Sequence, residues 1–382
     1  MDVVSYSLPA VVPDLRSSRL VAVVVVIVLL FGGLFAWRLR ADREVATGRT
    51  PTSTLASAAG DTMVGYLVTA AGAMLSESVG GQGRMIAPGI VFPVIAAGTD
   101  GFQVFDSCNR PGWVGSDGVE PGLVPIERNR RLEESVFVID PGHGLPDLGA
   151  VGPSGLTEAE VNIDVSARIV ELLRSPHDID WSTGAVTPGT TVPSVAAAIL
   201  TRAPDGPNGG DYEVGLTFRA LLGNAVDATA LVSIHHNTEP TRNLEHPGSS
   251  AFVSAANPES PRLGGLVVEE LRTAFSRFDA DWVGGKGDGL NIRVGTDGDD
   301  YYTILEVSEH PAVIVEGAYI SNPSEEALIM TDDFRQAYAD GVYRALVRFV
   351  TTDDDPIRAP EPELFDVEAA PRSMDDCVVP TP

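Results

Sequence analysis

Positive charge is scarce in this sequence. The chain has 26 lysines and arginines against 53 aspartates and glutamates, so its formal net charge at pH 7 is -27. No basic face and no internal repeat is visible along the chain. A chain this acidic repels phosphate groups, which argues against nucleic acid or an anionic lipid surface as a partner.

The rest of the composition is that of a globular protein. With 382 residues, of which 44% are hydrophobic, the chain is long enough to form two or three domains with a sizeable core. Part of the excess acidity lies in residues 352–382, which are rich in proline and acid and lack periodicity. We expect this segment to be a disordered tail.

A long uncharged run lies close to the N-terminus. Residues 20–37 read LVAVVVVIVLLFGGLFAW and are flanked by Arg19 and Arg38. A helix of this length spans roughly 27 Å, close to the thickness of a bilayer core. We interpret the run as a single transmembrane anchor, preceded by a short N-terminal segment at residues 1–19. A buried core helix or the apolar part of a cleaved signal peptide would also fit, although no small-x-small cleavage site follows closely.

A polar linker and a β-rich segment follow the predicted anchor. Residues 38–62 are small and polar, as in a flexible tether. Within residues 63–122, short β-like runs alternate with glycine turns at the spacing of a small antiparallel barrel. The order FPVIAAGTDGFQVFDSCNRPGWV, which ends in PGWV at residues 111–114, resembles the C-terminal half of a bacterial SH3-like domain. An extra sheet on the main domain is the alternative.

Residues 134–351 alternate buried strands with amphipathic helices, which is typical of an α/β domain. The spacing of apolar residues predicts helices at 157–173, 261–278 and 332–350. Thr157 is the expected N-cap of the first helix, so Glu158 falls in its first turn.

Three buried runs of this domain end at residues that can carry chemistry. VFVIDPGH ends at His143, ATALVSIHHN contains His235 near its end, and PAVIVEGAYISN contains Glu316. Ligands of open α/β sheets collect at the carboxyl ends of the strands. We therefore expect these side chains to meet at one edge of a sheet.

The residue types suggest a catalytic zinc site. Zinc in such sites often takes two histidines and one carboxylate, which His143, His235 and Glu158 would supply. The sequence has no HExxH motif, so the ligands must come from separate segments. Taken singly, each histidine also fits a structural, hydrogen-bonded role. His236 competes with His235, because consecutive side chains of a strand face opposite ways.

The remaining histidines lie in loop-like polar contexts. They are His177, His246 and His310, and we interpret them as structural.

The whole α/β region resembles one known family. The segment VFVIDPGHGLPDLGAVGPSGLTEAEVN, followed by LTR, LTFRALLGNAVDATALVSIHHN and PAVIVEGAYISNPSEEALIM, resembles the zinc-dependent N-acetylmuramoyl-L-alanine amidases, amidase type 3. The resemblance implies a twisted mixed sheet with helices on both faces. It also implies that His143, Glu158 and His235 bind Zn²⁺ and that Glu316 is the catalytic residue.

Some positions depart from the family pattern or have an open role. The departures are Leu145 in place of a second glycine, Ala159 in place of a lysine and Ala318 in place of a glycine, which puts substrate fit and loop geometry in doubt. Arg202 and Arg219 match family positions, and we interpret them as an ion-pair scaffold. Asp147 either supports a histidine ligand or is a solvated loop carboxylate.

The resemblance further implies hydrolysis of the amide between N-acetylmuramic acid and the L-alanine of the peptidoglycan stem peptide, in cell-wall remodelling or cell separation. Zinc would polarise the carbonyl, and Glu316 would take the water proton and pass it to the leaving amine. A catalytically silent wall-binding or regulatory protein on the same fold is the alternative. A zinc peptidase that cuts another amide is a second. The activating protein, if one exists, is not indicated by the sequence.

The substrate also suggests where the domains lie. The arginines on the two sides of residues 20–37 nearly balance, so charge does not orient the anchor. Peptidoglycan lies outside the membrane, so we expect a cytoplasmic N-terminus, a single-pass anchor and an extracellular catalytic domain. The two cysteines, Cys108 and Cys377, would then lie where disulfides persist. They form either a bridge or two free thiols.

Overall fold

The computed structural model describes most of the chain after residue 64. The described residues are 65–88, 90–106, 110–120, 131–202, 214–238, 248–283, 289–296, 298–356 and 361–364. The predicted anchor at 20–37, its flanking segments, Cys108 and Cys377 lie outside these ranges. No helix within them combines the length and apolar character that crossing a bilayer requires.

The β-rich segment forms a sheet of its own. Its strands are β1 Gly65–Thr69, β2 Met74–Ser76, β3 Gly83–Met85, β4 Val91–Gly98, β5 Gly101–Phe105, β6 Pro111–Gly115 and β7 Val119–Glu120. They pair antiparallel in the order β3-β2-β6-β5-β4-β1-β7, and a 3-10 turn at Ser116–Gly118 precedes β7. Phe92, Pro93 and Val94 of β4 are all buried. Among the described residues, none of these strands pairs with the second large sheet.

The second sheet is mixed, as the resemblance implied. Its strands are β8 Val136–Pro141, β11 Ala197–Leu200, β12 Ala230–Asn237, β13 Ser250–Val253, β14 Leu290–Val294, β15 Ala312–Tyr319 and β16 Glu361–Leu364. The order is β11-β8-β12-β15-β13-β14-β16. Neighbouring strands run parallel except for β13, which is antiparallel to β15. A separate hairpin joins β9 His177–Asp180 and β10 Ala185–Pro188.

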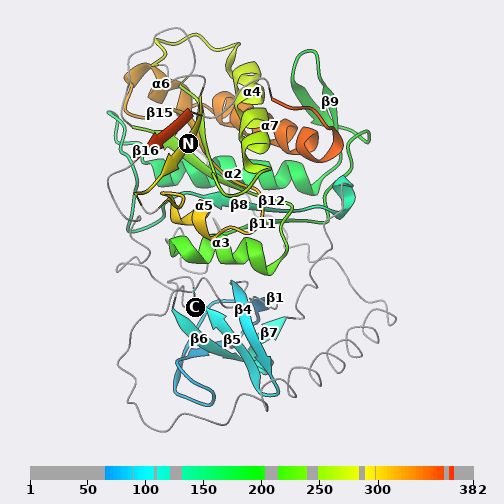
Figure 1. The fold of residues 1–382 in the computed structure, drawn as a ribbon, viewed down its shortest axis with the longest axis vertical. Helices are drawn as coiled ribbons and strands as arrows, with labels where there is room; N and C mark the ends of the chain where they lie inside the picture. The colour runs from blue at the N-terminus through cyan, green and yellow to red at the C-terminus, as the bar shows by residue number, and fades with distance from the viewer. Residues whose placement is uncertain are drawn as a thin grey trace, which may run out of the picture. The chain divides into compact units, whose positions relative to one another are not determined.

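Helices cover both faces of this sheet (Figure 1). They are α2 Glu158–Arg174, α3 Leu216–Ala225, α4 Ser260–Phe275, α5 Thr303–Val307, α6 Pro323–Ile329 and α7 Asp332–Thr351, with a 3-10 turn at Leu132–Glu134 before β8. On one face, Ile139 and Val232 pack in a cluster with side chains of α2, α4 and α7. On the other, Val138 and Leu231 pack with side chains of α3 and α5. Successive residues of a strand face opposite sides of the sheet, so β8 and β12 are buried on both sides.

The predicted helices are confirmed with small shifts at their ends. The helix predicted at 157–173 is α2, and the Thr157 side chain accepts a hydrogen bond from the Glu160 backbone N–H at its start. The helices predicted at 261–278 and 332–350 are α4 and α7. A second threonine cap, Thr331, begins α7. Sequence periodicity was sufficient for these elements because each buries a broad apolar stripe.

The C-terminal segment departs from its prediction at four residues. We expected residues 352–382 to be disordered, but residues 361–364 form β16, which pairs parallel with β14. The open edge of β14 offers backbone N–H and C=O groups that an extended segment can pair with, whatever its side chains are. Residues 357–360 and 365–382 lie outside the described ranges.

Candidate metal and catalytic site

His143 lies just beyond the end of a buried strand. Strand β8 ends at Pro141, two residues before the end that the sequence suggested, and His143 has a φ of 61°. A histidine in this left-handed region costs about 1–3 kcal/mol, so the surroundings must hold it there. The Arg219 guanidinium does so by donating to the His143 carbonyl at 2.9 Å.

Two buried arginines hold the loop that carries His143. Arg219 also donates to the Pro141 carbonyl and pairs with Asp140. Arg202 donates to the carbonyls of Pro141, Gly142 and Ala159, each at 3.0 Å. Both arginines thus have a structural role, and the expected ion pair is seen for Arg219, whereas Arg202 holds the loop through hydrogen bonds to backbone carbonyls.

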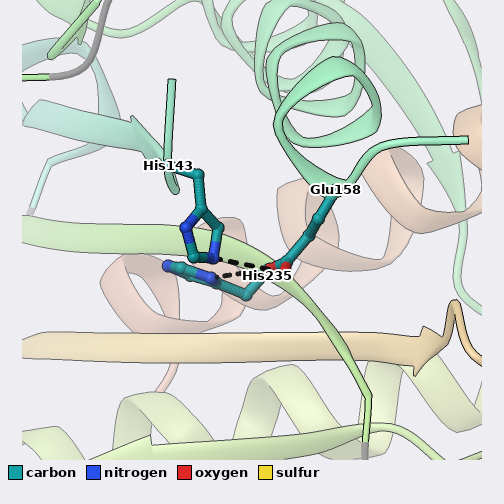
Figure 2. A group of neighbouring side chains, drawn as sticks. All are labelled: His143, Glu158 and His235. Carbon is teal, nitrogen blue, oxygen red and sulfur yellow. Dashed lines mark hydrogen bonds and ion pairs between the residues drawn. The ribbon is translucent and has the colours of Figure 1, made fainter. Parts of the chain in front are cut away.

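Glu158 is the first residue of α2, and its carboxylate lies beside the rings of both histidines, with an interaction to each (Figure 2). Oε2 is 3.2 Å from His143 Nε2, and Oε1 is 2.9 Å from His235 Nδ1. The backbone N–H of Ala150 donates to Oε2, and that of His236 donates to Oε1. The carboxylate is thus buried, charged and aimed at the histidine nitrogens.

The alternation along β12 separates the two neighbouring histidines. His235 pairs in register with Glu316 of β15 and turns toward Glu158. His236 turns to the other face, where it is buried, contacts Asn162 and packs its ring edge against Tyr338. Burial lowers the pKa of His236 to about 4, so the ring is neutral. Of the two, His235 is the one at the cluster, as the geometry of a strand required.

Close packing makes glycine necessary beside His235. A Cβ added to Gly142 would lie 2.2 Å from the His235 ring. The DPGH loop therefore places its backbone directly against one candidate ligand while it presents the other. This contact explains a glycine whose φ is not unusual.

His143, Glu158 and His235 fit a metal ion. Their ligand atoms all lie within 4.8 Å of one another, with two imidazole nitrogens and one carboxylate oxygen. Burial opposes the charge on Glu158, but hydrogen bonds with His143 and His235 lower the pKa of this carboxyl well below its usual range. Two histidines and a glutamate are a common protein ligand set for catalytic zinc. The donor atoms present therefore suit Zn²⁺.

Asp147 supports one of these histidines. Its Oδ2 lies 2.7 Å from His143 Nδ1, and its Oδ1 accepts from the Gly149 N–H. Although burial opposes protonation of the ring, hydrogen bonds to Asp147 and Glu158 raise the pKa of His143 to about 10. A carboxylate on the far nitrogen of a metal-binding histidine orients the ring. Of the two roles considered for Asp147, the structure shows the histidine contact.

Glu316 is partly exposed, but one of its carboxylate oxygens is buried with little compensation. Its Oε2 is buried and has no hydrogen-bond partner among the described residues. Burial raises the pKa of Glu316 to about 8, and the charge of Glu158 adds to the shift, while His143 and Arg293 oppose it. Perturbed carboxyls of this kind gather at active sites.

The comparisons with known proteins place this site in a family. A family model described as N-acetylmuramoyl-L-alanine amidase matches residues 137–348, more than half of the 382 residues. The matched region contains His143, Glu158, His235 and Glu316. The chain belongs to this family. The mixed α/β fold and the N-acetylmuramoyl-L-alanine amidase class agree with the expectation from the sequence.

The curated relatives share about a quarter of the aligned residues with this chain. The germination-specific N-acetylmuramoyl-L-alanine amidase of Bacillus subtilis is 25% identical over 227 residues, which cover 59% of this chain and 84% of that protein. N-acetylmuramoyl-L-alanine amidase AmiC of Neisseria meningitidis is 25% identical over 248 residues, which cover 59% of this chain and 55% of that protein. The amidase match thus spans about half of the second relative.

Solved structures also match the amidase domain. The catalytic domain of CwlV, an N-acetylmuramoyl-L-alanine amidase from Bacillus (Paenibacillus) polymyxa var. colistinus, has 22% sequence identity and a TM-score of 0.42 and covers 57% of this chain and 99% of that one. AmiC2 of Nostoc punctiforme has 22% identity and a TM-score of 0.41, with 56% and 97% covered.

Other residues of the amidase domain have structural roles or were missed. His177 lies in β9 with Nδ1 2.8 Å from the Ser175 carbonyl, and His310 is buried beside Pro311. Both keep the structural interpretation, although neither lies in an open polar loop. His246 lies outside the described residues. Sequence reasoning missed Asn162, which an i, i+4 spacing from Glu158 places on the same side of the helix.

Proposed function

We propose that this protein is a zinc-dependent hydrolase of the amide between N-acetylmuramic acid and the L-alanine of the stem peptide, and that it acts in cell-wall remodelling or cell separation. The observation that carries the proposal is the meeting of His143, Glu158 and His235 beside Glu316, within the region that matches the amidase family. A silent wall-binding protein would have no need to keep all four.

Different residues of the chain would bind the metal and transfer the proton. His143 Nε2, His235 Nδ1 and a Glu158 oxygen would hold the ion, since these atoms already converge. When bound there, Zn²⁺ supplies Lewis-acid polarisation of the substrate carbonyl and acidifies water. Glu316 takes the proton of the attacking water and returns it to the leaving amine. A carboxyl whose pKa is raised toward neutrality suits both transfers.

The decisive experiment uses purified muropeptides. The protein is incubated with them and the products are identified by mass. Release of intact stem peptides with a free L-alanine amine supports the proposal. Cuts only within the stem peptide would support a zinc peptidase, and unchanged muropeptides that still bind would support the silent wall-binding alternative.

Metal analysis tests the zinc site independently. We expect one zinc per chain in the wild-type protein and its loss in His143→Ala and His235→Ala, because each substitution removes one of three ligands. A variant that keeps a full equivalent of zinc would show that the ligand set is wrong.

We further propose an extracellular amidase held by a single-pass anchor at residues 20–37, with the SH3-like segment as a wall-binding or positioning module. The proposal rests on the location of peptidoglycan outside the membrane and on the antiparallel β-structure of residues 65–120. Protease added to intact spheroplasts should remove the amidase domain and spare the N-terminus. Protection of the whole chain would contradict this placement.

A bridge between Cys108 and Cys377 stays a proposal of the same kind. It would tie the tail to the β-rich segment, since the ends of domains are often close in space. Non-reducing peptide mapping of exported protein tests it, and two alkylatable thiols would refute it.

A further inference from the structure

Asn162 is a fully buried polar side chain one turn after Glu158 on α2. Its amide nitrogen lies 3.2 Å from the Gly142 carbonyl and 3.4 Å from Glu158 Oε1. Its amide oxygen lies 2.9 Å from His236 Nδ1. The side chain thus joins the metal-site loop, a candidate ligand and the histidine that points away from the metal site.

These contacts determine the orientation of both side chains. The Gly142 carbonyl and the Glu158 carboxylate can only accept hydrogen bonds, so the NH₂ end of the amide must face them. The amide oxygen then faces His236, whose Nδ1 must carry the hydrogen. The other ring nitrogen, Nε2, is buried without a hydrogen-bond partner among the described residues. A neutral ring with its hydrogen on Nδ1 satisfies this arrangement at the lowest cost.

His236 reaches the same carboxylate oxygen by two routes. Its backbone N–H donates directly to Glu158 Oε1 at 3.1 Å, and its ring orients the amide that donates to that oxygen. Oε1 is also the oxygen nearest to His235 Nδ1. The other oxygen, Oε2, accepts from the backbone N–H of Ala150 and lies near His143 Nε2.

We propose that Asn162, oriented by His236, is a positioning residue that holds the Glu158 carboxylate in its metal-binding orientation. This inference rests on the zinc site of the proposed function. A residue needed only for packing at this buried position would be apolar, because a buried amide and imidazole are costly unless they are hydrogen-bonded. Residues that orient metal ligands in this way typically change metal affinity by about 10- to 100-fold when removed.

The test is the zinc dissociation constant of the full-length protein, measured by competition with a chromophoric chelator. We expect Asn162→Ala and His236→Leu to bind zinc about 10- to 100-fold more weakly than wild type. His236→Asn should restore near-wild-type affinity, because its NH₂ group lies where Nδ1 donates. The visible spectrum of the Co²⁺-loaded variants provides a second readout, since it reports the ligand geometry directly.

Ser166→Ala is the matched control. Ser166 is buried on the same helix one turn further on, and its hydroxyl has no hydrogen-bond partner among the described residues. This substitution should leave zinc affinity unchanged. If Asn162→Ala fails to fold, the contrast between His236→Leu and His236→Asn decides the question.

The outcomes separate this inference from the proposed function. Tight zinc binding by the wild type and by all variants alike would overturn the inference and leave the proposed function intact. Equal losses in His236→Leu and His236→Asn would also overturn it, because the donor would then not matter. A wild-type chain that binds no zinc would overturn both.

Discussion

Asp140, which is buried, and Glu316, which is partly exposed, are carboxyls on the same face of one sheet, on the two strands that flank β12. Asp140 receives hydrogen bonds from Thr201, Ser233 and Arg219. Glu316 has a buried oxygen with no hydrogen-bond partner among the described residues. Burial opposes the charge of both, yet Arg219 and the two hydroxyls lower the pKa of Asp140, whereas the pKa of Glu316 rises to about 8.

The two differ both in depth and in the supply of hydrogen-bond partners. A saturated carboxylate is a fixed charge that orients its neighbours, and Asp140 in this way anchors the arginine that holds the His143 backbone. An unsaturated one can change its protonation near neutral pH. We therefore expect Asp140 to act as a structural acid and Glu316 as the proposed catalytic acid, and substitutions can test this division.

Glu316→Gln should have the largest effect. We expect amidase activity to fall by about 100- to 10,000-fold, because the amide keeps the shape but cannot accept a proton. Muropeptide cleavage measures the loss, while zinc content and thermal unfolding should match wild type. Wild-type turnover by this variant would show that another residue is the general base.

Asp140→Asn should affect stability most. The substitution leaves the buried Arg219 without its charge partner, which we expect to lower the free energy of unfolding by about 3 to 5 kcal/mol. Urea unfolding of the protein measures this change. A loss below that of an exposed control, such as Asp332→Asn, would show that Asp140 is not an anchor.

The lowered pKa of Asp140 also predicts how the stability of the protein depends on pH. Because the native pKa of Asp140 is lowered, its contribution to stability is complete above the unfolded pKa of about 3.9 and is lost as the pH falls through the native value. Below pH 4, the wild type should therefore lose more stability than Asp140→Asn does. Parallel acid unfolding curves for the two proteins would contradict this.

Asp147→Ala tests a partly exposed carboxylate that contacts a candidate metal ligand. It lies at the surface end of His143, and its removal should weaken zinc binding by about 10- to 100-fold with little change in stability. Asp147→Asn, which can still accept a hydrogen bond, should lose less. Equal zinc affinities for the wild type and Asp147→Ala would leave the contact without a role in the site.

Thr157→Ala should give the smallest effect. The Thr157 hydroxyl caps α2 over a long 3.4 Å contact, so we expect a loss of about 0.5 to 1 kcal/mol in the free energy of unfolding. Thr157→Ser keeps the acceptor and serves as the control. A large fall in zinc affinity would show that the cap also positions Glu158, one residue later.

Much of the site could be predicted because its parts are local. Strand ends, a capped helix start and family motifs indicated His143, Glu158, His235 and Glu316, and the alternation of a strand indicated that only one of two adjacent histidines could join them. The contact between Asn162 and His236 could not be predicted, since it needs the distance between α2 and β12. Strand β16 was missed because its pairing depends on an open edge far away in sequence and hardly on its own composition.

The tail strand also changes how the amidase sheet ends. Without it, β14 would be the outermost strand, and its unpaired backbone could recruit another chain and lead to aggregation. The strand that replaces it at the margin is short and contains Pro362 between two glutamates. Proline has no backbone N–H to donate to a further strand, which discourages growth of the sheet at this edge. We therefore expect a shortened chain that ends with α7, and so leaves the β14 edge unpaired, to self-associate more readily than the full chain.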